Sequence, residues 1–254
     1  MEVSTDPQAE PPLLERLALP ARLYEKHGTR TLVIFDEFQD ILATRERADA
    51  VIRSEIQHHG DAASYIFAGS HVGMMRNLFA DKRRAFYGQA GPVDLPPLRP
   101  DDVASYIAVR FEETTRSIGT ALDRLLDTAQ GHPQRTMLLA HLLWNLTPVD
   151  GEANEETWLT AYDQAMHQVH DELRATWSAL PPSQRRVLAS VAENTESIYS
   201  ASRRHGGSRG GTPRAAVEGL IERGEIVGDS TAETGYRLVD PLLAAWVREG
   251  RSGR

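Results

Sequence analysis

The chain has 254 residues, of which 41% are hydrophobic and 25% charged, with a formal net charge of −8 and no cysteine. This length fits two compact domains, and the composition excludes a wholly disordered chain. The absence of cysteine excludes disulfides, thiolate metal sites and a cysteine nucleophile. Apolar runs such as Leu32–Phe35 are far shorter than the roughly 20 residues of a membrane helix. Because Met1–Glu10 also lacks the apolar stretch of a secretory signal, we expect a soluble, cytoplasmic protein with no membrane contact.

The charge is distributed unevenly along the chain. Trp177–Arg254 has 11 arginines and 9 acidic residues, a net charge of +2, whereas the preceding 176 residues have 17 basic and 27 acidic residues, a net charge of −10. A general polyanion-binding protein would not be acidic over its first two thirds. Nucleic-acid contact is therefore a candidate function of the C-terminal third only.

The first hundred residues alternate predicted helices with short strands. Thr31–Phe35 is an apolar, β-branched run without polar alternation, the pattern of a strand buried on both faces of a parallel sheet. A helix ending at Gly28 precedes this strand. The following elements are predicted to be a helix over 41–59, a strand over 64–68, a helix over 72–84 and a third strand over 93–95.

From Pro100 onward the pattern predicts helices, followed by one pair of strands. Asp101 is a candidate N-cap, Pro133 suits the first turn of a helix, and Asn154 is a candidate cap for a long helix extending through Leu173. Pro181–Pro182 marks a boundary. The predicted helices cover 102–115, 121–130, 133–146, 154–173, 183–193 and 212–223, and the predicted strands cover 225–227 and 236–239.

Two adjacent carboxylates follow the first predicted strand. Asp36 and Glu37 would lie at the carboxyl end of a parallel sheet, where open α/β folds bind ligands. In a nucleotide site the first carboxylate helps to hold Mg²⁺ and the second polarises an attacking water. The alternative is that acidic residues simply follow a strand as a helix cap.

These residues belong to a segment that resembles a known family. Leu32–Ile41, LVIFDEFQDI, looks like the Walker B segment of AAA+ ATPases, and is closest to the archaeal-type ATPases related to signal-transduction and origin-recognition proteins. Three further segments keep the family's order. Tyr65–His71 resembles the sensor 1 strand, Gly131–Arg135 resembles the lid-helix start that carries sensor 2, and Tyr236–Leu243 resembles the end of a winged-helix domain. The resemblance covers roughly Thr31–Val247.

The resemblance implies ATP and Mg²⁺ as cofactors and assigns roles to individual residues. Asp36 would hold magnesium through the nucleotide, Glu37 would be the catalytic base, and Ser70 at the sensor 1 strand tip would contact the γ-phosphate or the water. Arg135 would face phosphate from the first turn of its helix. The alternatives are an ordinary Gly-Ser turn at Ser70 and a solvated arginine at Arg135.

Two arginines follow the helix after the sensor 1 segment. Arg83 and Arg84 lie near the position where AAA+ proteins place an arginine finger for the neighbouring subunit. A finger acts only when subunits assemble around the nucleotide. The alternative is a solvated charge cluster formed with Asp81 and Lys82.

The phosphate loop of the family, G-x-x-x-x-G-K-[ST], does not occur in the sequence, whose only lysines are Lys26 and Lys82. This loop supplies the backbone N–H groups and the lysine that hold the phosphates. We therefore expect weak or no ATP binding by this chain alone, and ATP hydrolysis at background level. Only 30 residues precede the predicted Walker B strand, which begins at Thr31, so either the sequence is a fragment or the protein has lost its phosphate loop.

The C-terminal segment has the predicted order of a winged-helix domain. Thr212 and Pro213 begin a candidate recognition helix whose buried face is Val217, Leu220 and Ile221. The candidate DNA contacts are Arg203, Arg204, Arg209 and Arg214. Because winged helices of this family also bind proteins, DNA contact and protein contact both remain open.

The predicted architecture has three parts. These are a partial α/β AAA+ nucleotide domain of the P-loop type (1–99), a helical lid with a connecting helix (100–176) and an α+β winged-helix domain (177–254). The expected function is that of an AAA+-like ATP-binding protein with a regulatory or scaffolding role. The alternative is a non-enzymatic DNA-binding or protein-interaction module built on a decayed or truncated ATPase. The uncovered strand edge left without the phosphate-loop strand also predicts self-association or a protein partner.

Overall fold

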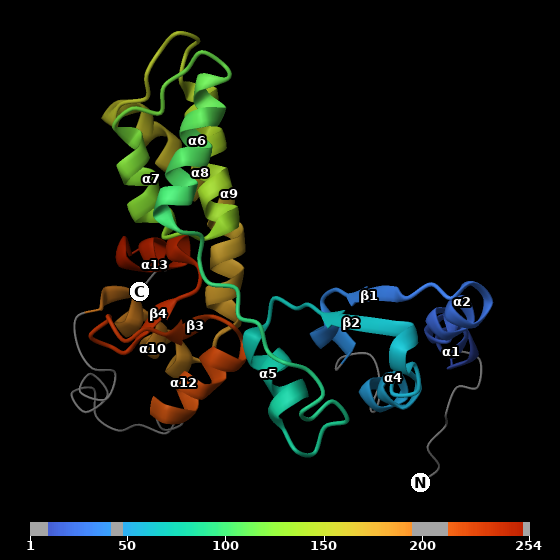
Figure 1. The fold of residues 1–254 in the computed structure, drawn as a ribbon. Coiled ribbons are helices and arrows are strands. Elements are labelled where there is room, and N and C mark those ends of the chain that lie inside the picture. Colours follow the sequence, from blue (N-terminus) through green and yellow to red (C-terminus); the bar gives the residue numbers. More distant parts are fainter. Residues whose placement is uncertain (1–9, 42–47, 195–212, 251–254) are drawn as a thin grey trace. The chain divides into compact units, whose positions relative to one another are not determined.

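The computed structural model describes residues 10–41, 48–194 and 213–250 (Figure 1). By its internal contacts the chain divides into two compact units. Unit 1 is Met1–Val93 together with Glu222–Gly224, and unit 2 is Asp94–Ile221 together with Glu225–Arg254. No helix in the described part of the chain is long and apolar enough to cross a membrane. The three-part division at 99 and 176 stays a prediction.

Unit 1 is built on two parallel strands. β1 (Thr31–Phe35) pairs with β2 (Ala63–Phe67) in parallel, as the prediction of a parallel sheet requires, and the register sets Phe35 beside Phe67. Gly28, with φ 67°, ends the preceding helix, where the left-handed backbone suits glycine. The other elements are α1 (Glu10–Leu17), α2 (Leu19–His27), the 3₁₀ turns η1 (Phe38–Asp40) and η2 (Gly60–Ala62), α4 (Ala48–Ile56) and α5 (Val72–Ala80).

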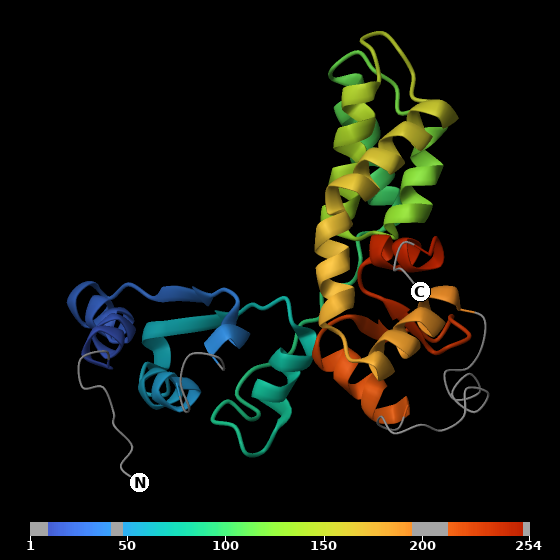
Figure 2. The ribbon, with the colours of Figure 1, turned by 180° about the vertical axis from the view of Figure 1, so that it is seen from behind.

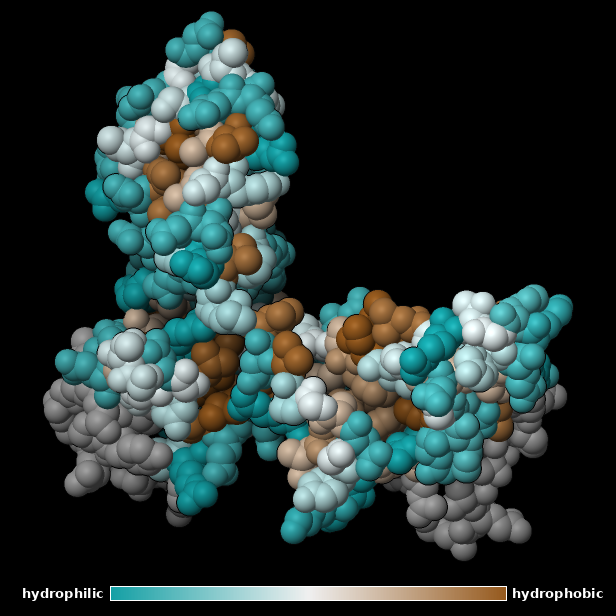
Figure 3. All heavy atoms as spheres, viewed as in Figure 1, coloured by the Kyte–Doolittle hydropathy of each residue, from teal (hydrophilic) through white to brown (hydrophobic). Residues whose placement is uncertain are grey.

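The strands are buried on one face only, so the prediction of burial on both faces is wrong. Phe35 and Phe67 stack on the inner face and contact a core that contains Phe38. On the other face Leu32, Ile34 and Ile66 are 59%, 60% and 48% exposed. Figure 3 shows apolar residues at the surface of this sheet. Burial alternates along each strand because, among the described residues, other elements pack on one face of the sheet and leave the other face open.

The predicted third strand at 93–95 is also wrong. Val93 and Leu95 are 83% and 91% exposed, and the segment forms no ladder with another strand in the described residues. Pro96 and Pro97 follow at once and lack the N–H donors that a central strand needs. The helix predicted over 72–84 ends at Ala80, because Asp81 turns to extended backbone and accepts hydrogen bonds from Arg83.

Unit 2 begins with helices that lie side by side in both views of the chain (Figures 1 and 2). They enclose an apolar core that we call the lid cluster, which includes Ile107, Leu125, Leu139 and Trp158. The helices are α6 (Pro100–Glu112), α7 (Ala121–Ala129), α8 (Pro133–Leu146) and α9 (Glu155–Ala179).

The helix starts agree with the sequence in two of three cases. Pro133 opens α8, and Asn154 caps α9 in a capping box with Thr157. Asp101 is not the N-cap of α6: the helix begins at Pro100, with Arg99 before it. Asp101 instead lies in the first turn, where its negative charge still interacts favourably with the positive end of the helix dipole.

The second core of unit 2, the C-terminal cluster, is formed by the last elements of the chain with the second half of α9. It includes Leu173, Leu188, Leu220 and Trp246. The elements are α10 (Pro182–Glu193), α12 (Pro213–Glu222), an antiparallel hairpin of β3 (Ile226–Gly228) and β4 (Tyr236–Leu238), and α13 (Pro241–Arg248). The sequence did not predict α13 as a helix, and the winged-helix assignment stays a prediction.

Candidate functional site

The candidate site lies where β1 and β2 end in unit 1. Backbone pairing continues past the strands, because Ala68 N donates to Phe35 O at 2.8 Å and Phe38 N donates to Ala68 O at 2.9 Å. These bonds hold the turn after β1 against the turn after β2. They bring three of the predicted site residues, Asp36, Glu37 and Ser70, to one edge of the sheet.

The carboxylate of Glu37 is the centre of this group. Its Oε2 accepts hydrogen bonds from Gln39 Nε2 at 2.5 Å, Ser70 Oγ at 2.9 Å and Ser70 N at 3.2 Å. These donors, Gln39 first and Ser70 next, hold the pKa of Glu37 below its ordinary value of 4.5. Glu37 is therefore an ionised acceptor near neutral pH.

The backbone of Glu37 is in an uncommon conformation. Its φ of 46° and ψ of 43° lie in the left-handed region, which non-glycine residues rarely occupy. The Glu37 N–H donates to Asp36 Oδ1 at 3.0 Å, so the two carboxylates are oriented by one local turn. Such conformations persist where the surrounding structure enforces them, and they occur often in functional sites.

Gln39 is a residue of this site that the sequence did not single out. Its side chain is buried, its amide nitrogen binds Glu37, and its Oε1 has no hydrogen-bond partner. A Cβ at Gly69 would lie 2.1 Å from that oxygen and 2.7 Å from Met75 Sδ, so a larger residue there would require the Gln39 and Met75 side chains to move. The closeness of Gln39 to Glu37 in sequence, two residues away, is the one signal that could have pointed to it. Its burial depends on the packing of α5, which the sequence pattern does not show.

The oxygen atoms at this edge suit a magnesium–nucleotide better than a bare metal ion. Mg²⁺ prefers hard oxygen ligands and takes several of them from phosphate and water. Asp36, Glu37 and Ser70 provide carboxylate and hydroxyl oxygens, and Asp36 is exposed. No group of three or more His, Cys, Asp or Glu residues among the described residues could hold a metal ion. The phosphates of a nucleotide would have to supply the remaining ligands.

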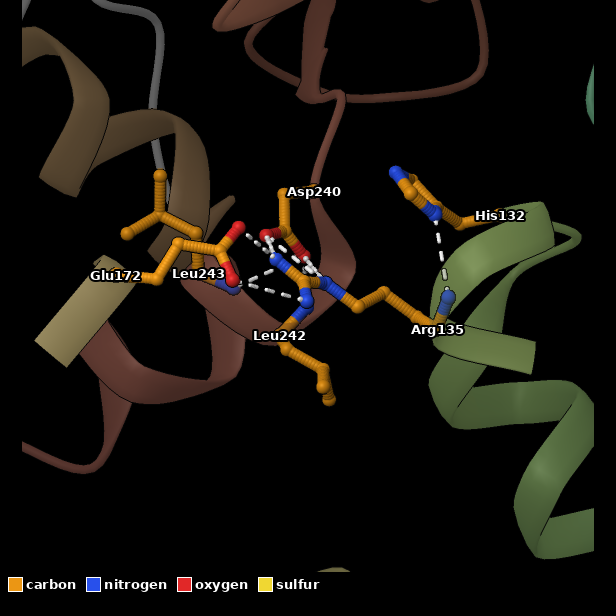
Figure 4. Close-up of polar contacts among 6 residues, drawn as sticks. All are labelled: His132, Arg135, Glu172, Asp240, Leu242 and Leu243. Atoms are coloured by element: carbon orange, nitrogen blue, oxygen red, sulfur yellow. Dashed lines mark hydrogen bonds and ion pairs between the residues drawn. The ribbon is translucent and has the colours of Figure 1, made fainter. Parts of the chain in front are cut away.

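Arg135 lies in unit 2, in the first turn of α8, and its side chain is only 3% exposed. Its guanidinium donates to Asp240, with Nη2–Oδ2 at 2.6 Å and Nε–Oδ1 at 3.1 Å, and to Glu172, with Nη2–Oε1 at 2.8 Å (Figure 4). Burial acts to lower the pKa of Arg135, but the bonds with Asp240 and Glu172 outweigh burial and raise it. The alternative of a solvated arginine is therefore wrong, and the phosphate role stays a prediction.

The two candidate finger residues have partners within unit 1. Arg83 binds Asp81 with two donors, Nη2–Oδ2 at 2.8 Å and Nε–Oδ1 at 3.1 Å, and these bonds lower the pKa of Asp81 to about 2. Arg84 Nη1 lies 3.9 Å from Oδ2 of the buried Asp49. These contacts agree with a charged surface cluster, and a finger role stays a prediction.

The candidate DNA contacts fall mostly outside the described residues. Arg203, Arg204 and Arg209 lie in the 195–212 segment, which the structure does not describe. Arg214 is exposed in the first turn of α12, where its Nε donates to Glu218 Oε1 at 2.8 Å. The DNA-binding prediction therefore stays open.

The fold has a counterpart among solved structures. A Walker-type ATPase of Pyrococcus abyssi superposes with a TM-score of 0.73 at 20% identity, covering 93% of this chain and 68% of that chain. The ORC2 protein of Aeropyrum pernix, solved as ADPNP and ADP complexes, matches with a TM-score of 0.46 at 17% identity, covering 99% of this chain and 73% of that chain. No protein-family model and no curated protein matches the sequence. The first structure thus confirms the resemblance to archaeal-type ATPases at the level of the fold.

Proposed function

We propose that this chain, whose fold is that of a Walker-type ATPase, is an AAA+-like ATP-binding protein with a regulatory or scaffolding role. One observation carries the proposal: Asp36, Glu37 and Ser70 meet at the carboxyl edge of two parallel strands. This edge is where open α/β folds bind their ligands.

Each residue has a role that its surroundings support. Asp36 is exposed and would hold Mg²⁺, which neutralises phosphate charge when it is bound with ATP. Ser70 offers both a hydroxyl and an N–H donor, so it can contact a phosphate oxygen or an attacking water. Glu37 is ionised, and its three hydrogen bonds all go to Oε2, so a water bound at Oε1 could be polarised without displacing a donor.

The test is calorimetric titration of the full chain with MgATPγS. We expect weak binding to the wild type that Asp36→Asn reduces about tenfold or more, because a hydrogen bond to a charged group contributes about 1.5–3 kcal/mol. Removal of magnesium with EDTA should produce the same loss and make the two proteins alike.

Asp61→Asn is the matched control. Asp61 is an exposed carboxylate just before β2, at the opposite edge of the same sheet, and pairs with Arg30 at 3.6 Å. Equal affinities for Asp36→Asn and Asp61→Asn would contradict the assignment of the site. Complete absence of binding to the wild type, even at millimolar nucleotide, would contradict the function itself.

A second candidate function is that of a non-enzymatic protein-interaction module. The observation in its favour is the exposed apolar face of the sheet, formed by Leu32, Ile34 and Ile66. Apolar patches of this kind on soluble domains often mark interaction sites. The two functions differ in their use of the sheet, because ATP needs its carboxyl edge and a protein partner needs its open face.

A further inference from the structure

The outer edge of β1 has no strand beside it in the described residues. There β1 has a hydrogen-bonded neighbour, β2, on one side only. The N–H and C=O groups on the other side of such a strand can pair with a strand of another chain. Proteins commonly block an edge strand with a charged residue or a proline, and Thr31–Phe35 contains neither. Nothing within the strand itself therefore opposes the addition of a further strand.

Opposite charges flank β1 at its two ends. Arg30 directly precedes the strand, Asp36 directly follows it, and both are exposed. Arg30 Nε donates to Asp61 O at 2.8 Å, and Nη2 lies 3.6 Å from Asp61 Oδ1. Because exposed pairs of this kind are weak and a guanidinium has five N–H donors, Arg30 can also bind another carboxylate. Asp36 accepts from Glu37 N through Oδ1, at 3.0 Å, so Oδ2 remains for a further donor.

The sequence around β1 is complementary to itself when two copies run antiparallel. With a twofold axis at Val33, Leu32 of each copy lies opposite Ile34 of the other. The same register places Arg30 opposite Asp36. Leu32 and Ile34 are both on the open face of the sheet, and the period of two places the flanking charges on that face as well. Apolar pairs and opposite charges that face each other across two strands both stabilise a sheet, and the twofold axis makes each pair occur twice.

Other registers of β1 against itself lose this match. A shift by two residues sets either Arg30 opposite Ile34 or Asp36 opposite Leu32, so that a charge meets an apolar side chain. A shift by one residue places the open face of one copy on the same side as the packed face of the other. The charges and the apolar residues therefore specify one register.

The outer edge of β2 does not have this property. An axis at Tyr65, the middle residue of β2, sets Ser64 opposite Ile66, a polar residue against an apolar one. The nearest charged residue, Asp61, would lie opposite Gly69 and gain no partner. Charge complementarity thus favours the edge of β1.

We propose that a second copy of this chain adds to the edge of β1, antiparallel about Val33, and forms a four-stranded sheet in the order β2–β1–β1–β2. Two Arg30–Asp36 ion pairs close the ends of the seam between the copies. Leu32 and Ile34 of the two copies contact each other along it and cover part of the apolar surface that Figure 3 shows on this sheet. This inference does not rest on the proposed function.

Sedimentation of the full chain without nucleotide tests the ion pairs. Arg30→Asp alone sets two carboxylates opposite each other at both ends of the seam, and Asp36→Arg alone sets two guanidinium groups there. Each variant should raise the dimer dissociation constant about tenfold or more, because two attractive pairs become repulsive. In an equimolar mixture, every heterodimer regains two pairs of opposite charge, so the mixture should dimerise like the wild type. Asp123→Arg, at an exposed carboxylate on α7, is the control and should also dimerise like the wild type.

Cysteine cross-linking tests the register. The chain has no cysteine of its own, so every disulfide must come from an introduced residue. Val33→Cys sets two thiols opposite each other at the axis, at a separation of opposed residues that a disulfide spans. Mild oxidation should therefore convert this variant to a covalent dimer, and Leu159→Cys, at an exposed position on α9, should stay unlinked.

Three results would each overturn the pairing. They are a wild type that sediments as a monomer at tens of micromolar, a mixture of the charge variants that sediments like its separate components, and a dimeric Val33→Cys protein that oxidation leaves unlinked. The last result would place the contact between copies on another surface.

Discussion

At the scale of single residues, the carboxylate of Glu37 accepts hydrogen bonds from two segments of the chain. Gln39 reaches it from the η1 turn and Ser70 from the turn before α5. Both donors stabilise the ionised form, so the pKa of Glu37 lies below 4.5 in the folded chain. This contribution to stability is present above about pH 4.5 and is lost as the pH falls through the lowered folded-state pKa.

This geometry makes a prediction for Gln39→Leu. The substitution removes the Gln39 amide, the donor that lowers the pKa of Glu37 most, and places an apolar side chain in its buried position. The pKa of Glu37 should therefore rise toward 4.5. NMR titration of the side-chain carboxyl carbon of Glu37 measures it. Ser70→Ala should act in the same direction, and Gln57→Leu, at an exposed glutamine in unit 1, should leave the titration unchanged. An unshifted titration in Gln39→Leu would show that the amide does not stabilise the carboxylate.

At the scale of elements, the two-stranded sheet is the least covered part of unit 1. Parallel strands normally have both faces packed, because their crossovers place other elements on each side. In the described residues β1 pairs only with β2, and one face of the pair exposes Leu32, Ile34 and Ile66. An exposed face next to an unpaired strand edge favours association with another chain.

We therefore predict that the chain self-associates through this face at micromolar concentration. Ile34→Lys combined with Ile66→Lys should shift the sedimentation profile toward monomer, since each places a charge on the open face. Leu159→Lys is the control, because Leu159 is equally exposed but lies on α9 in unit 2. A wild type that sediments as a stable monomer at tens of micromolar would contradict the prediction.

At the scale of the whole molecule, charge is segregated along the chain. Trp177–Arg254 is slightly basic while the rest is strongly acidic, and four arginines fall within a short stretch of sequence, at 203, 204, 209 and 214. The net charge of +2 is a weak attraction for DNA. The ion pair of Arg214 with Glu218 weakens it further.

DNA binding, if this segment carries it, must depend on those four arginines. Changing Arg203, Arg204, Arg209 and Arg214 to alanine should flatten the dependence of log affinity on log salt by roughly four units. The measurement is duplex-DNA binding by the full chain at several salt concentrations. The control changes four arginines of the lid helices and their flanks, Arg99, Arg110, Arg124 and Arg174. No detectable binding at low salt would exclude DNA and favour a protein partner for this region.

The sequence by itself determined the features that depend on neighbouring residues. Helix ends at Gly28, Pro133 and Asn154 follow from backbone freedom, ring geometry and side-chain capping, all of which act within a few residues. The two apolar runs predicted strands of a parallel sheet, with Asp36 at the carboxyl end of the first, while the place of Ser70 at the tip of the second came from the family resemblance.

Only the tertiary structure decided what surrounds each side chain. An apolar run shows that a strand is buried but not on how many faces, and so the open side of β1 could not be foreseen. Gln39 is buried beside Gly69, and the positive charge of Arg135 is balanced because Glu172 and Asp240 approach it from distant segments. Burial and charge pairing depend on contacts between residues far apart in sequence, which local pattern does not encode.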